Sequence, residues 1–123
     1  MGEKNKYVSY KQMIEHENEN TDYKIIERYG APETAIIAIH GGGIEAGTTE
    51  VAGAIAGKDY SFYSFLGIKS KGNWDLHLDS RVFMEGSCLA MVNKADQVVS
   101  IHGCEIENAE AEGDVFLGDE MTS

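Results

Sequence analysis

An apolar run at residues 34–40, Thr-Ala-Ile-Ile-Ala-Ile-His, leads directly into three glycines at 41–43 and leaves few folds open to the chain. Such an unbroken run is typical of a strand that is buried on both faces of a sheet. Residues 48–56 then have helical character behind a capping hydroxyl. We predict a central strand, a glycine-rich loop and a helix, in this order.

The rest of the chain alternates between strand and helix patterns. Ser9 is a typical N-cap for a short helix at 10–16, and a second helix is expected at 83–95. Further strands are expected at 23–29, 59–68, 76–78, 97–102 and 115–118. This alternation predicts a single α/β domain over residues 1–123, a three-layer sandwich with a mixed, mostly parallel sheet.

Two histidines stand at the ends of predicted strands, His40 and His102, and Glu45 follows His40 across the glycines. Ligands of α/β sheets gather beyond the carboxyl ends of the strands. Two His and one carboxylate are a common ligand set of catalytic zinc, with a fourth position left for water. The alternative is that the glycines cradle a phosphate and His40 is only hydrogen-bonded, although the chain has neither GxxxxGK[ST] nor GxGxxG.

The charge balance excludes some partners. The sequence has 10 Lys and Arg in total against 21 Asp and Glu, which gives a formal net charge of −11. This charge would repel nucleic acid and anionic lipid. A polyanionic substrate would need a locally positive site, such as a metal ion. No apolar stretch approaches a membrane span and the N-terminus is polar, so we expect cytoplasmic synthesis, followed either by retention or by release on lysis.

The two cysteines, Cys88 and Cys104, form no CxxC pair, so neither a zinc ribbon nor a thioredoxin-like motif is supported. We expect free thiols. A disulfide between them is the alternative in an oxidising setting.

Two long motifs carry a family resemblance: Ile-Ala-Ile-His-Gly-Gly-Gly-Ile-Glu at 37–45 with Gly-Thr-Thr-Glu at 47–50, and Val-Val-Ser-Ile-His-Gly-Cys at 98–104. Together with residues 76–80 and 115–118, they resemble the phage and bacillus poly-γ-glutamate hydrolases. The resemblance implies a zinc carboxypeptidase-like fold, hydrolysis of γ-glutamyl amide bonds in capsule polymer, and Zn²⁺ held by His40, Glu45 and His102. It also makes His77 a candidate for contact with a substrate or an intermediate, and the alternative is that His77 is an ordinary polar residue on a strand edge. Arg81 is a further candidate, because a guanidinium can bind a substrate carboxylate bidentately.

The chain departs from that family pattern in two places. Residues 83–86 read Phe-Met-Glu-Gly where the family has Phe-Asp-Glu-Pro. Family members also continue beyond the strand at 115–118, and the resemblance places their catalytic glutamate in that later part. The chain is therefore expected to be the N-terminal part of the family domain, incomplete at the C-terminus, with its catalytic residue unknown. The glutamates at 105, 107 and 110 are better explained as a solvated acidic loop.

Two functions follow from this reasoning. The first is a zinc-dependent hydrolase of poly-γ-glutamate, which would give a phage access to encapsulated cells. The second is a truncated, non-catalytic zinc-binding remnant that still binds polyglutamate. A shortened domain would also leave a sheet edge uncovered, so either a partner such as another copy of this chain covers it or the fold is marginally stable.

Overall fold

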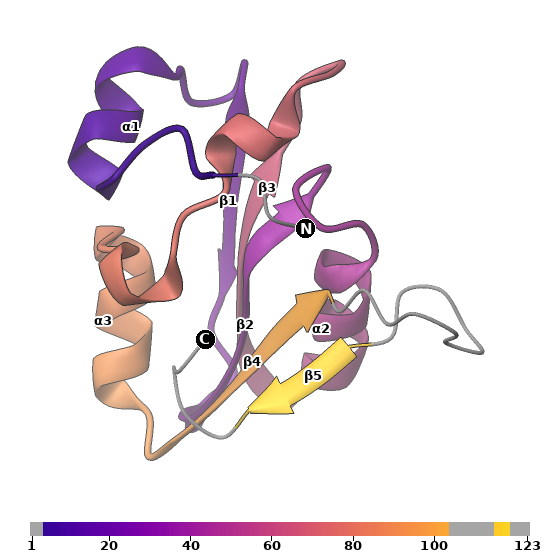
Figure 1. Ribbon diagram of the computed structural model, residues 1–123. Coiled ribbons are helices and arrows are strands. Elements are labelled where there is room, and N and C mark those ends of the chain that lie inside the picture. Colours follow the sequence, from indigo (N-terminus) through magenta and orange to yellow (C-terminus); the bar gives the residue numbers. More distant parts are fainter. Residues whose placement is uncertain (1–3, 104–114, 119–123) are drawn as a thin grey trace.

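The computed structural model describes residues 4–103 and 115–118, and its centre is one mixed sheet of five strands (Figure 1). The strands lie in the order β1-β3-β2-β4-β5. β2 pairs in parallel with β3 and with β4, whereas β1 and β5 pair antiparallel with their single neighbours. Three of the five strands therefore run in one direction, as the sequence predicts. The bounds are β1 Tyr23–Arg28, β2 Ala31–Gly42, β3 Tyr60–Gly67, β4 Gln97–Gly103 and β5 Val115–Gly118.

The apolar run in β2 is buried on both sides, which explains why it does not alternate. Ile37 and Ile39 face one apolar cluster, and Ile36 and Ala38 face another. All four are at most 2% exposed. Because successive strand side chains point to opposite faces, both faces of β2 must be covered.

Helices cover both faces, which confirms the three-layer prediction (Figure 1). α1 (Tyr10–His16) and α3 (Gly86–Lys94) lie on one face, where Met13, Cys88 and Met91 join the larger cluster. α2 (Thr48–Ala56) lies on the other, where Ala52 and Ala56 join the smaller cluster. No helix in the described part of the chain is both long and apolar enough to cross a bilayer.

Two predicted elements differ from the structure. α3 begins at Gly86 rather than at 83, because the Glu85 side chain accepts from the backbone N–H groups of Ser87 and Cys88 and caps the helix there. Residues 76–78 are not a strand. A 3₁₀ helix, η1 (Asn73–Leu76), ends at this point, and a second one, η2 (Ser80–Val82), follows. The predicted acidic loop at 105–114 and Cys104 lie outside the described residues.

Candidate metal centre

His40 lies near the end of the central strand, 4% exposed, and the glycine loop folds Glu45 back over it. Gly42 has a φ of +59°, which a side chain would make unfavourable. The Glu45 N–H then donates to the His40 carbonyl at 3.0 Å. The hydroxyl of Thr48, the first residue of α2, donates to the carbonyls of both His40 and Glu45, at 3.2 and 3.0 Å. Strand, loop and helix thereby hold the two side chains in one place.

The glycine loop is not arranged to bind phosphate. The Gly42 N–H donates to Thr49 Oγ1 at 3.0 Å, and the Gly43 N–H donates to the Gly67 carbonyl at 2.9 Å. An anion nest needs such N–H groups free to converge on the ligand. The loop's contacts therefore argue against the phosphate-binding alternative and point to the placement of Glu45.

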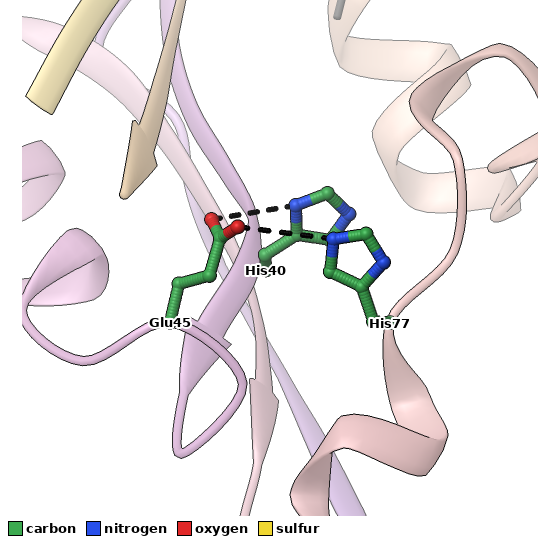
Figure 2. A group of neighbouring side chains, drawn as sticks. All are labelled: His40, Glu45 and His77. Carbon is green, nitrogen blue, oxygen red and sulfur yellow. Dashed lines mark ion pairs between the residues drawn. The ribbon is translucent and has the colours of Figure 1, made fainter. Parts of the chain in front are cut away.

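Three metal-binding donor atoms, from His40, Glu45 and His77, lie within 4.8 Å of one another (Figure 2). The His40 Nε2–H donates to the Leu78 carbonyl at 2.6 Å. The other nitrogen of that ring, Nδ1, is buried, has no hydrogen-bond partner among the described residues and lies 3.5 Å from Glu45 Oε1. His77 Nε2 lies 3.7 Å from the other carboxylate oxygen. A buried polar atom without a partner is costly, and a metal ion at this point would satisfy it.

His77 comes from the segment between η1 and η2. Its ring is stacked between two others: the centroids of Trp74 and His40 each lie 4.0 Å from its own, with interplanar angles of 16° and 23°. Its Nδ1–H donates to Asn5 Oδ1 at 2.8 Å. The second nitrogen, Nε2, is thereby left to face the carboxylate of Glu45.

His102, in β4, is the fourth side chain at this edge of the sheet. Its ring centroid lies 5.5 Å from that of His40 at an angle of 60°, and its Nε2 is 3.1 Å from Ser100 Oγ. Burial lowers the pKa of His102, and the charge of a neighbouring imidazole at His40 lowers it further. His102 is therefore a neutral imidazole near neutral pH, the form that binds metals.

The carboxylate of Glu45 is held in its charged form. Burial by itself raises the pKa of Glu45, but the imidazoles of His40 and His77 and the N–H of Gly103, which donates to Oε1 at 3.0 Å, together hold that pKa well below its usual range. Two or three imidazoles with one carboxylate are a donor set that zinc and related divalent ions accept. The residues present therefore fit a metal ion.

Arg81, the other predicted substrate-binding residue, is largely exposed in η2. Its guanidinium binds Asp79 bidentately, with Nε–Oδ1 and Nη2–Oδ2 distances of 3.0 and 2.6 Å. In this conformation the guanidinium is occupied by a neighbour, and a substrate carboxylate would have to compete with Asp79 for it.

Some contributors to the site have no signal in the sequence. Asn5 and the Leu78 carbonyl bind the two imidazoles across separations of 72 and 38 residues. In a sequence, a single Asn in a polar segment cannot be told from other polar residues, and every residue has a backbone carbonyl. Trp74 lies in η1, and His77 follows it by three residues. Side chains three residues apart in a 3₁₀ turn lie on the same side, so this spacing could have identified Trp74.

Comparison with known proteins identifies the family of the chain. Residues 7–119 match the family described as poly-gamma-glutamate hydrolase. Two curated relatives from Bacillus subtilis (strain 168) are 38% identical: the UPF0714 protein YndL, over 86% of this chain and 41% of its own length, and the SPbeta prophage-derived UPF0714 protein YoqZ, over 80% and 35%. The chain thus spans about two fifths of the length of the curated relatives it matches.

Two solved structures have the same fold. One is a zinc-free structure of YndL, with a TM-score of 0.77 and 38% identity, covering 82% of this chain and 49% of that one. The other is a bacteriophage poly-gamma-glutamate hydrolase, with a TM-score of 0.79 and 29% identity, covering 86% and 52%. From the motifs, the sheet and these matches, we conclude that the chain belongs to the poly-γ-glutamate hydrolase family.

Proposed function

We propose that this chain carries the zinc-binding half of a hydrolase that cleaves γ-glutamyl amide bonds in poly-γ-glutamate. The observation that carries the proposal is the buried, unpartnered Nδ1 of His40, 3.5 Å from a Glu45 carboxylate that is held ionised. Membership of the family and the likeness to a phage hydrolase support the choice of substrate. The mention of zinc in the name of the YndL structure supports the choice of metal.

Two imidazoles compete to be the third ligand beside His40 and Glu45. Two imidazoles that share a tetrahedral zinc at Zn–N distances of about 2.0–2.1 Å hold their ring centroids roughly 5 Å apart. The tilted pair of His40 and His102, at 5.5 Å, fits this better than the stacked pair of His40 and His77, at 4.0 Å. The short donor distances favour His77 instead. We propose His102 as the ligand and His77 as the side chain that faces the substrate.

Zinc bound here would lower the pKa of a water molecule to about 7 and polarise the amide carbonyl. The chain's own residues would hold the ion and place the His77 imidazole beside it. Arg81 stays a candidate for a substrate carboxylate if it leaves Asp79.

The second candidate function is a zinc-binding module that grips polyglutamate without cleaving it. The observation that favours it is that Glu45 is the only carboxylate in the group of metal-binding side chains that the described residues form, so this group offers no second carboxylate as a general base. Both functions use the same metal centre and differ only in turnover.

Incubation of the zinc-loaded chain with poly-γ-glutamate, followed by size-exclusion chromatography of the polymer, separates the two functions. Shortening of the polymer that is lost in His40→Ala would establish the hydrolase. An unchanged polymer with one zinc bound per chain would establish the binding module. A chain that binds no zinc would contradict both.

Zinc affinity of His77→Ala and His102→Ala identifies the third ligand. Loss of a residue that only supports a metal ligand typically weakens metal binding ten- to hundredfold. We expect His102→Ala to weaken zinc binding at least as much, because it removes an atom bonded directly to the ion. We expect His77→Ala to weaken zinc binding less than His102→Ala does, because it removes no atom bonded to the ion. The reverse pattern, measured by competition with a chromophoric chelator, would assign the ligand to His77 and refute the choice of His102.

A further inference from the structure

The N-terminal segment reaches across the fold to touch the site at a single side chain. Asn5 Oδ1 accepts the Nδ1–H of His77 at 2.8 Å, although the two residues are 72 positions apart. Its neighbours in sequence are Lys6 and Tyr7.

Those neighbours hold the segment in place. Lys6 Nζ lies 3.5 Å from Asp75 Oδ2, in η1, just before His77. The Tyr7 hydroxyl donates to the buried carboxylate of Glu17 at 2.6 Å, and Tyr7 itself is 5% exposed. Lys69 then joins Glu17 and Asp75, at 2.9 and 3.2 Å. Consecutive residues of one extended segment are thus tied to the element that presents His77.

Stacking by itself does not determine which way the His77 ring points. The rings of Trp74 and His40, on its two sides, fix the plane of the His77 ring. They still allow a 180° rotation about the Cβ–Cγ bond, which returns the ring to the same plane. A flip would exchange Nε2 for Cε1 opposite the Glu45 carboxylate and leave no nitrogen there. An acceptor on the Nδ1 side prevents the flip and also requires the proton to be on Nδ1.

We infer that Asn5 is a positioning residue for the reaction: by accepting the Nδ1–H of His77 it selects that tautomer and fixes the ring orientation, so that Nε2 faces the Glu45 carboxylate. The inference deepens the proposed function, since it assumes that His77 serves this site. It also gives a role to the N-terminal segment, which lies outside the two motifs that contain His40, Glu45 and His102.

Nitrogen-15 NMR of the imidazoles in the metal-free chain at about pH 8 tests this directly, with His77→Ala used for assignment. The wild type should show His77 as the Nδ1–H tautomer. Asn5→Ala should move it toward the Nε2–H form that neutral imidazole prefers in water. Asn5→Asp keeps an acceptor oxygen and should preserve the wild-type tautomer. Asn93→Ala, at an exposed position of α3, is the matched control and should change nothing.

The functional test measures how tightly the zinc-loaded chain and its variants bind a γ-linked glutamate oligomer. Loss of one positioned hydrogen bond predicts roughly three- to tenfold weaker binding in Asn5→Ala. The same substitution should have no further effect in the His77→Ala background, because it acts through that ring. An unchanged tautomer in Asn5→Ala, or equal losses with and without His77, would overturn the inference. A wild type that binds no oligomer would instead refute the proposed function, while the NMR result would still decide the role of Asn5.

Discussion

Gly41 shows how tightly the residues behind the metal centre are packed. A Cβ built on it would lie 2.1 Å from Thr49 Oγ1 and 2.6 Å from Ser64 Oγ, two hydroxyls that hydrogen-bond to each other at 2.8 Å. Gly41→Ala should therefore destabilise the fold by about 1–3 kcal/mol, the usual cost of overpacking, and weaken metal binding. Urea unfolding and zinc titration measure the two effects.

Gly53, in the interior of α2, is the matched control for Gly41. A Cβ there would meet only Phe62, at 3.6 Å, an ordinary contact. Gly53→Ala should stabilise the protein by roughly 0.5–1 kcal/mol, because alanine loses less backbone entropy in a helix. If both substitutions changed stability equally, the close approach at Gly41 would not be what requires glycine.

Cys88 should be chemically inert in the folded protein. Burial, reinforced by the charge of Glu85, raises the pKa of its thiol to about 12. Unfolding restores a pKa near 8.5, so the folded state binds the proton more tightly, and stability contributed by Cys88 is lost as pH rises from about 8.5 toward 12. In a Cys104→Ser background, alkylation at pH 8 should be slow without denaturant and fast with it. Fast alkylation of the folded chain would contradict the buried position.

Among the elements, α3 depends most on one side chain. Glu85 Oε1 accepts from the Tyr63 hydroxyl at 2.7 Å and from the Cys88 N–H at 2.9 Å, and Oε2 accepts from the Ser87 N–H at 3.0 Å. Glu85→Ala should cost roughly 2–4 kcal/mol, because it removes a cap and leaves a buried hydroxyl without an acceptor. Ser9→Ala, which removes the cap of α1, should cost about 1 kcal/mol. Thermal unfolding followed by circular dichroism compares them, and similar losses would argue against a special role for Glu85.

Elements whose patterns are local could be predicted from the sequence. The bounds of α2 are those predicted, and the apolar run in β2 identified the central strand, because both signals lie within one segment. Residues 76–78 misled the prediction: Leu76 and Leu78 are buried and His77 is not, which is the alternation of a strand. Within residues 4–103 and 115–118 no strand pairs with them, and pairing is a property of the fold that the segment itself does not encode.

The same distinction divides the site. His40 and Glu45 could be predicted because they belong to one motif, and the structure brings them together. The assignment of His102 as a ligand stays a prediction, as does the substrate contact of His77. That His77 would lie beside Glu45 could not be derived from spacing, since it depends on η1 and on an asparagine at the other end of the chain.

At the scale of the whole molecule, the net charge of −11 acts against a polyanionic substrate. Repulsion between distant exposed charges is screened within about 8 Å at 0.15 M salt. Binding of poly-γ-glutamate should therefore strengthen as salt rises from about 0.01 to 0.15 M, opposite to the trend for a basic binding surface. Calorimetric titrations at several salt concentrations test this, and monotonic weakening would indicate that local positive charge dominates.

The outer strands of the described sheet are β1 and β5. Pairing of such an edge with another copy of the chain stays a prediction. Light scattering coupled to size-exclusion chromatography over a range of concentrations would detect it, and a monomer at all concentrations would contradict it.

Trp74 is the only tryptophan in the sequence, and its indole lies flat against His77. The chain's tryptophan fluorescence therefore originates at the site itself, in contact with an imidazole whose position and charge affect the excited indole. Filling of the metal position, displacement of His77 by a substrate or release of the N-terminal segment would each change the emission. The protein carries its own optical probe, and the early events at this centre can be followed in a stopped-flow instrument without any label.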